Sequence, residues 1–131
     1  MERQSGPMID KIGGEAGVHL LVNHFYDLIE SLPEGAAIMA MHQNGHGLDH
    51  VRPAQFEFLC GFFGGRRYYL ERNGHMSLRE IHAHVEIRLE DANDWLSVMA
   101  RAMAETSVAE PMRGEIMATF RRAARMLVNT L

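Results

Sequence analysis

Hydrophobic residues recur at helical spacing in the first part of the chain. Over positions 18–29 they fall three or four residues apart, which places them along one face of an α-helix. Gly13 and Gly14 separate this stripe from a short apolar turn at 9–12, and a Ser-Leu-Pro segment at 31–33 interrupts it. The pattern predicts a long amphipathic helix that begins just after the two glycines and ends before the proline.

A second segment, 55–63, is apolar around almost the whole circumference of the helix that it predicts. Such a helix must be covered on more than one side, so either it crosses the centre of the molecule or a flat apolar group lies against it. Pro53 is expected in the first turn of this helix, where a missing N–H is tolerated. Gly64 and Gly65 are expected to end it with a C-terminal cap and a tight turn.

Further helices are indicated before and after this segment. Residues 34–41 are expected to form one or two helical turns ahead of a glycine-containing loop. Ser77 has a glutamate three positions later, which is the spacing of a helix N-cap and predicts a short helix there. A long helix is expected to open at Glu90 or Asp91, and a final helix follows the stripe over 112–127.

The segment 66–77 between these helices is polar and aromatic, with a turn expected at Asn73 and Gly74. No part of the chain alternates hydrophobic and polar residues between turn signals, as a half-buried strand would. The sequence therefore predicts an all-α fold.

Length and composition restrict the class of protein. The 131 residues suffice for one domain over 1–131, with residues 1–8 expected to form a flexible N-terminal extension. The net charge of −4 argues against a nucleic-acid binder, and neither a membrane span nor a signal peptide is evident. The lone Cys60 excludes an internal disulfide and is consistent with a reducing compartment. We therefore expect a cytoplasmic single domain.

Histidines provide the first candidates for chemistry. His42, His46 and His50 are four residues apart, but glycines within that span favour a solvated loop over a helical metal site. His82 and His84 diverge by about 200° on a helix, so at most one of them faces inward. A lone inward histidine is more often a hydrogen-bonded core residue than a ligand.

The order of short motifs along the chain is more informative than any single motif. They are His24-Phe25-Tyr26-Asp27, Phe56-Glu57-Phe58-Leu59, Phe62-Phe63-Gly64-Gly65, Tyr69 to His75, Leu78-Arg79-Glu80-Ile81-His82, Asp94-Trp95-Leu96 and Ala124 to Asn129. In this order and spacing the chain, from about Ile12 to its C-terminus, resembles the truncated haemoglobins of the second group.

The resemblance implies a two-over-two helical sandwich around one haem b. The iron ligand of the family falls on His82, which agrees with an inward histidine on a short helix. The ligand-stabilising positions fall on Tyr26, Gln55 and Trp95, whose hydroxyl, amide and indole N–H are all donors. A buried and unpaired Gln55 would cost about 1–3 kcal/mol, so either a bound ligand pairs with it or it is partly exposed.

The resemblance also places other side chains around the haem. They are Phe25, His42, Val51, Phe58, Phe62, Arg66, Tyr69, Ile81 and Val85. His42 falls at the haem edge and Val51 at the gate on the ligand side. Ile81 stands where the family has an arginine, and Ala83-His84-Val85 replaces the usual Leu-Pro-Phe. We expect Arg66, Arg67 or Tyr69 to anchor a haem propionate in place of the missing arginine.

The implied function is binding of O₂, CO, NO or similar ligands at haem iron, for O₂ binding, sensing or redox detoxification. A peroxidase-like or nitric-oxide-oxidising activity would need an external reductase. A homodimer is compatible with this interpretation, whereas nucleic acid and membrane are not expected as partners. The alternative from another class is a haem-free globin-like interaction module whose pocket is filled by Met and Phe side chains.

Overall fold

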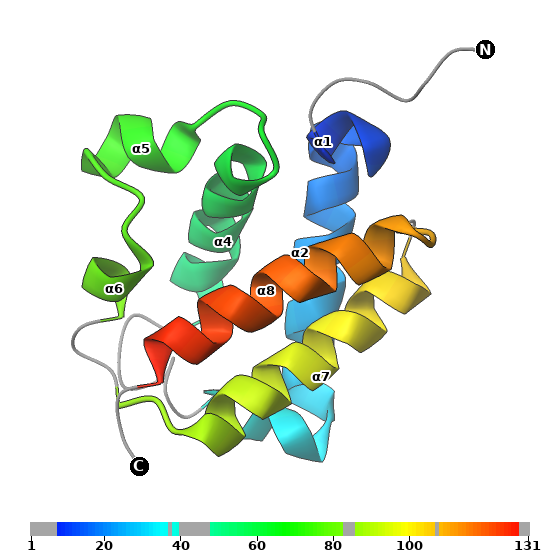
Figure 1. Cartoon of the computed structure of the whole chain (residues 1–131), viewed down its shortest axis with the longest axis vertical. Coiled ribbons are helices and arrows are strands. Elements are labelled where there is room, and N and C mark those ends of the chain that lie inside the picture. The colour runs from blue at the N-terminus through cyan, green and yellow to red at the C-terminus, as the bar shows by residue number, and fades with distance from the viewer. Residues whose placement is uncertain (1–7, 37, 40–47, 83–85, 107, 129–131) are drawn as a thin grey trace.

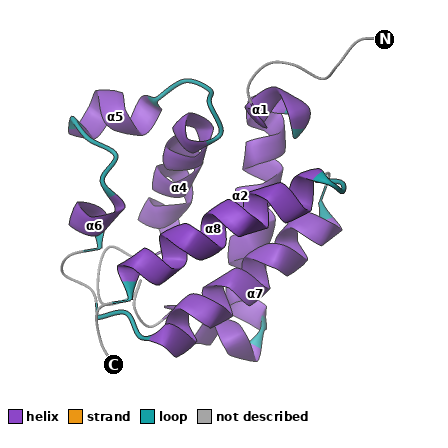
Figure 2. Cartoon of the chain, viewed as in Figure 1, coloured by secondary structure: helices purple, strands orange, loops and turns teal. Residues whose placement is uncertain are grey.

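A computed structural model describes residues 8–36, 38–39, 48–82, 86–106 and 108–128. Within these ranges the secondary structure is helical and no strand is present (Figures 1 and 2), so the predicted all-α class is confirmed. The elements are α1 (Met8–Lys11), α2 (Gly14–Ser31), the 3₁₀ turn η1 (Pro33–Gly35), α4 (Leu48–Phe62), α5 (Tyr68–Asn73), α6 (Leu78–Ile81), α7 (Leu89–Glu105) and α8 (Met112–Leu127).

The four long helices form two layers. In Figure 1, α7 and α8 run side by side at the front, while α2 and α4 pack together behind them. Contacts between α2 and α7 join the layers, α5 lies beside α4, and the short α6 contacts α8. This is the two-over-two arrangement that the family resemblance implies. None of the described helices is both long and apolar enough to cross a bilayer.

The core sits between the two layers. The stripe predicted over 18–29 is the buried face of α2, on which Val18, Leu21 and Phe25 are fully buried. Opposite it, α7 contributes Met99 and Met103, which have no exposed surface. The amphipathic pattern of α2 therefore faces the core as expected, with polar residues on its outer side.

The start of α2 and the end of α4 follow the glycine signals. Gly13 and Gly14 have φ values of 101° and 68°, in the left-handed region that favours glycine. At the end of α4, the Gly65 N–H donates to the Cys60 carbonyl and the Gly64 N–H to the Gly61 carbonyl, at 2.7 and 3.0 Å. This pair of bonds is a Schellman motif, so the predicted glycine cap is confirmed.

The prediction that Pro53 lies in the first turn of its helix is wrong. Helix α4 begins at Leu48, and Pro53 lies inside it. A proline there removes one hydrogen bond and disfavours helical geometry at the preceding residue, Arg52. The Arg52 side chain is fixed to α2 by several hydrogen bonds, and these contacts offset the local cost. Val51 therefore belongs to α4.

The remaining helices differ from expectation mainly at their boundaries. Helix α5 was not predicted, although the expected turn at Gly74 ends it with a φ of 79°. Helix α6 is capped by the Ser77 side chain as predicted. Helix α7 begins at Leu89, and the Asp91 carboxylate accepts a hydrogen bond from the Arg88 N–H at 3.0 Å.

The segment 34–41 was predicted to form one or two helical turns. There η1 is followed by helical residues 36, 38 and 39, and the predicted glycine-containing loop lies outside the described residues.

Candidate functional site

His82 lies directly after α6 and is held by its own helix. Its Nδ1 is 2.8 Å from the Leu78 carbonyl oxygen. A carbonyl can only accept a hydrogen bond, so Nδ1 carries a proton and Nε2 is the ring nitrogen available to coordinate a metal. The side chain is half-buried. This is the tautomer and the orientation lock that a metal-binding histidine needs.

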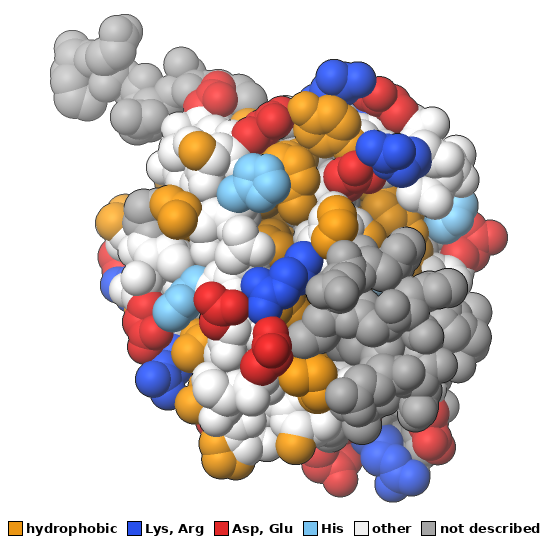
Figure 3. Space-filling model, turned by 180° about the vertical axis from the view of Figure 1, so that it is seen from behind, with side chains coloured by type: hydrophobic (Ala, Val, Ile, Leu, Met, Phe, Trp, Pro, Cys, Tyr) orange, Lys and Arg blue, Asp and Glu red, His pale blue; other side chains and the backbone are white. Residues whose placement is uncertain are grey.

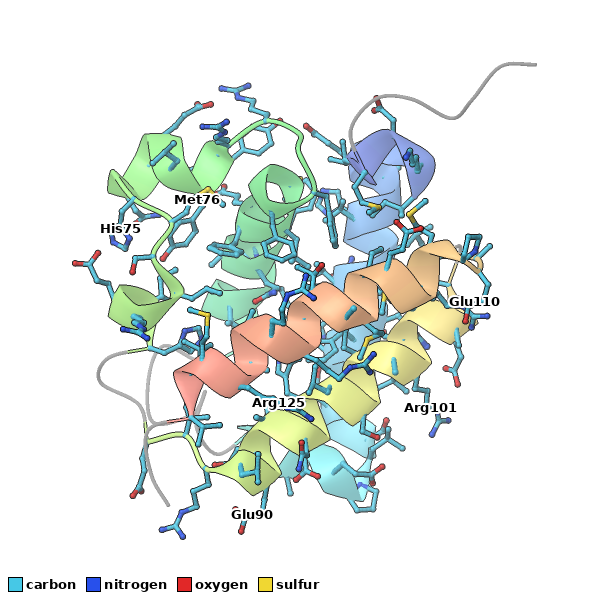
Figure 4. The ribbon with its side chains drawn as sticks, in the orientation of Figure 1. His75, Met76, Glu90, Arg101, Glu110 and Arg125 are labelled. Carbon is cyan, nitrogen blue, oxygen red and sulfur yellow. The ribbon has the colours of Figure 1, made fainter. Side chains whose placement is uncertain are left out.

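Local contacts fix the segment that carries His82. The Ser77 hydroxyl accepts the Glu80 N–H at 3.3 Å, and the Ser77 N–H donates to the His75 Nδ1 at 3.1 Å. Figure 4 labels His75 and Met76 on the stretch between α5 and α6. A Cβ added at Gly61 of α4 would lie 3.0 Å from the terminal methyl carbon of Met76. The absence of a side chain at Gly61 therefore lets this stretch approach α4 closely.

Tyr26 is buried in α2, with 1% of its surface exposed. Its ring meets the Phe25 ring edge-on at 4.9 Å between centroids. Burial raises the pKa of the Tyr26 hydroxyl well above its ordinary value, while the Arg52 cation opposes that rise. The phenol is therefore neutral and able to donate a hydrogen bond at physiological pH.

Trp95 of α7 reaches the same cluster from the other layer. Its ring lies 5.4 Å from Phe25 and 5.3 Å from Phe120, between centroids. Phe25 thus touches both Tyr26 and Trp95, which places two of the three predicted ligand-stabilising residues around one phenyl ring.

Gln55, the third of these residues, is half-buried in α4. Within the described part of the chain, its amide and the indole N–H of Trp95 have no hydrogen-bond partner. Both side chains are only half-buried, so neither one bears the full cost of a buried unpaired group. A half-buried Gln55 is consistent with both alternatives, pairing with a bound ligand and partial exposure.

The other predicted aromatic residues form a connected group. The Phe58 ring lies 6.1 Å from Phe62 and 5.5 Å from Tyr69, and Phe62 stacks on Phe120 at 5.5 Å. Since Phe120 also contacts Trp95, the group continues from α5 through α4 and α8 to α7. Val51 and Ile81 are half-buried and pack against the core.

Arg66 has other partners in the structure. Its guanidinium forms two hydrogen bonds with the Glu71 carboxylate at 3.0 and 3.1 Å and lies 4.5 Å from the Tyr68 ring centroid. Its side chain is 60% exposed. These two hydrogen bonds engage Nε and Nη2, so a propionate would share the guanidinium with Glu71. The predicted positions His42 and Val85, and the neighbouring His84, lie outside the described residues.

Arg52 is a residue beside this site that the sequence did not reveal. It binds Asn23, Asp27 and Glu30 of α2 and lies 5.7 Å from the Tyr26 ring centroid. These partners are 22 to 29 positions away in the chain, and no short-range pattern links them.

Comparisons with known proteins agree with this geometry. The bacterial-like globin family model matches residues 7–129. The group 2 truncated hemoglobin YjbI of Bacillus subtilis is 31% identical over 116 residues, which are 88% of this chain and 84% of that protein.

Solved structures are similar over nearly the whole chain. The group II 2-on-2 hemoglobin of Agrobacterium tumefaciens has a TM-score of 0.89 and 32% identity, with 98% of each chain covered. The truncated oxygen-avid haemoglobin of Bacillus subtilis has a TM-score of 0.82 and 30% identity, covering 95% of this chain and all of that one (100%). With its all-helical two-layer fold, this chain therefore belongs to the bacterial-like globins and is a truncated haemoglobin of group II.

Proposed function

We propose that this truncated haemoglobin binds haem b through His82 and holds O₂ or a similar diatomic ligand with Tyr26, Gln55 and Trp95. Membership of the family implies haem-based binding of diatomic ligands. The observation that carries the assignment of His82 is the 2.8 Å contact from its Nδ1 to the Leu78 carbonyl. That contact leaves Nε2 as the coordinating atom and makes the ring a better base.

The partly exposed hydrophobic side chains of the described residues would suit a flat apolar group. In the described part of the chain no three His, Cys, Asp or Glu side chains are arranged to hold a metal ion, so His82 would fit a single-histidine ligand of haem iron better than a protein-only metal site. Half-buried hydrophobic side chains come from four helices and from the stretch between α5 and α6, namely Val51, Phe62, Met76, Ile81, Trp95 and Ala124. A haem face would bury the surface that they leave exposed.

When bound, haem iron supplies a coordination position for the diatomic ligand. Tyr26, Gln55 and Trp95 would then donate hydrogen bonds to that ligand. The buried, neutral Tyr26 hydroxyl costs little reorganisation as a donor. A hydrogen bond to an acceptor that gathers negative charge is worth about 1.5–3 kcal/mol, which slows ligand release. The description of the Bacillus subtilis relative as oxygen-avid supports such slow release here.

Slow release suits O₂ scavenging, sensing or redox detoxification in the cytoplasm better than bulk transport. Tyr26 and Trp95 are the oxidisable side chains beside the proposed site, and repeated turnover with peroxide or nitric oxide would require an external reductase. Arg66, Arg67 and Tyr69 stay our candidates for the propionate anchor.

The proposal is tested by the absorbance spectrum of the purified protein and of two histidine variants. We expect a haem spectrum, identified as haem b after pyridine treatment, that is lost in His82→Gly and restored by added imidazole. His84→Ala should leave the spectrum unchanged. If the two variants behave the other way round, His82 is not the ligand. A colourless protein that takes up no added haem would instead indicate the haem-free interaction module.

A further inference from the structure

We propose that Arg52 is a positioning residue for Tyr26: held by three residues of α2, its guanidinium fixes the phenol ring and therefore the direction of the hydroxyl. This inference rests on the proposed role of Tyr26 toward the diatomic ligand. It adds to that role a residue on another helix that does not itself have to touch the ligand.

The guanidinium is bound at both of its terminal nitrogens. Nη1 donates to the Asn23 carbonyl at 3.1 Å and to its side-chain oxygen at 3.4 Å. Nη2 donates to an Asp27 oxygen at 3.0 Å and to a Glu30 oxygen at 2.7 Å. These acceptors are spaced by four and three residues, so they lie on one face of α2. The planar, rigid fork of arginine is therefore held in one orientation.

The same guanidinium lies over Tyr26. Its Cζ is 5.7 Å from the centroid of the phenol ring, within the range of a cation–π interaction. The Arg52 side chain is 24% exposed, compared with 70% for Arg72, which forms a two-bond pair with Glu57. Arg52 is thus more buried, and has more hydrogen-bond partners, than an arginine in an ordinary surface ion pair.

The backbone gives Arg52 a second link to the site. It is the residue before Pro53, a position at which helical geometry is disfavoured, yet it lies inside α4. Its contacts with α2 therefore hold the first turns of α4 in register with α2. Gln55 follows three residues later in the same helix. Arg52 consequently ties the element that carries Tyr26 to the one that carries Gln55.

The charges around Arg52 define the informative variants. On the outer side of α2, Asp27 and Glu30 carry two negative charges against the one positive charge of Arg52. Figure 3 shows the back of the molecule, where acidic and basic side chains lie next to one another between hydrophobic ones. Arg52→Met removes both the positive charge and the planar guanidinium, whereas Arg52→Lys keeps the charge and loses the guanidinium. Arg72→Met removes a comparable arginine–carboxylate pair elsewhere and serves as the matched control.

The first measurement reports on the ring itself. In the CO-saturated ferrous protein labelled with ¹³C at tyrosine Cζ, the three tyrosines give three signals, and Tyr26→Phe identifies one of them. We expect Arg52→Met to shift the Tyr26 signal and to leave those of Tyr68 and Tyr69 in place, while Arg72→Met leaves the Tyr26 signal unchanged. An unshifted Tyr26 signal in Arg52→Met would overturn the inference.

The second measurement is O₂ release by stopped flow. We expect Arg52→Met to accelerate release about threefold or more, as when one charge-assisted hydrogen bond is misdirected. Arg52→Lys should show a smaller effect, and CO release should change little. In a Tyr26→Phe background Arg52→Met should have a much smaller effect on O₂ release. Equal acceleration in both backgrounds would mean that Arg52 acts through general stability and would refute the positioning role.

The two measurements separate this inference from the proposed function. If Tyr26→Phe alone leaves O₂ release unchanged, the donor role of Tyr26 is wrong, and the ¹³C signal still decides whether Arg52 positions the ring. If Arg52→Met does not fold, Asp27→Ala combined with Glu30→Ala removes both acceptors of Nη2. That variant should then produce the same shift of the Tyr26 signal and the same faster O₂ release.

Discussion

Trp95 and Gln55 offer polar groups that no described residue pairs. The described part of the chain gives them no hydrogen-bond partner, and both are half-buried. Tyr26 differs from them, because it is completely enclosed and its pKa is raised by burial. At the scale of single residues, the proposed site thus combines one rigid donor with two that are open to a ligand.

We expect Trp95→Phe and Gln55→Leu to accelerate O₂ release, because each removes one donor and keeps an apolar side chain. The expected change is about tenfold for a lost hydrogen bond of 1.5 kcal/mol or slightly more. Carbon monoxide gathers little charge, so its release should change far less. The double variant should show less than the product of the single effects, since the donors share one acceptor. Identical changes for both gases would contradict a role in hydrogen bonding.

The elements show which parts of the structure short-range patterns can predict. The α2 stripe and the glycine cap of α4 were predictable because periodicity and left-handed turns are local properties. The start of α4 was not, because the side-chain contacts of Arg52 with α2 offset the local preference before Pro53. Helix α5 escaped prediction because its six residues are too short to show a period.

In the proposed site, too, some residues could be predicted from sequence motifs and others could not. The family motifs identified His82, Tyr26 and Trp95 as candidates, and the structure brings the last two together around Phe25. Arg52 could not be found in this way, because its partners lie in another helix and in a distant part of the sequence. The pairing of Arg66 with Glu71 was likewise not foreseen, although only five residues separate them.

Helix α6 is short, so its cap should matter more than in a long helix. The Ser77 hydroxyl accepts the Glu80 N–H, and one turn later His82 is bound to the Leu78 carbonyl. We expect Ser77→Ala to lower the free energy of unfolding by about 1 kcal/mol. It should also speed the transfer of haem to an apoprotein acceptor, because the lock on His82 loosens. Ser77→Asp keeps a capping side chain and should behave like the parent protein. If Ser77→Ala transfers haem no faster than the parent, the cap does not help to hold His82.

At the scale of the whole molecule, one surface cluster ties the two layers together. His24 of α2 lies 2.6 Å from a Glu105 oxygen at the end of α7, and Arg101 donates to the other oxygen at 2.7 Å. The hydrogen bonds from His24 and Arg101 lower the pKa of the Glu105 carboxyl. The charged form of Glu105 is therefore favoured in the folded protein.

A lowered pKa in the folded state contributes stability above the ordinary glutamate pKa and loses it as the pH falls through the folded value. We expect the free energy of unfolding of the parent protein to fall more steeply than that of Glu105→Gln as the pH drops from about 5 to about 3. Urea unfolding at several pH values measures both slopes. Glu115→Gln on α8 is the control, since no ion pair involves Glu115 in the described residues. Parallel slopes for Glu105→Gln and the parent would refute the link.

The placement of Trp95 between Phe25 and Phe120 has an optical consequence. The chain contains one tryptophan, so ultraviolet emission above the tyrosine band comes from this single position beside the proposed haem. A haem bound beside Trp95 would quench indole fluorescence through energy transfer, and unfolding moves the emission to longer wavelength. The native chain thus carries its own fluorophore. In one unlabelled sample the intensity of its emission reports cofactor occupancy, and the wavelength of its emission reports folding.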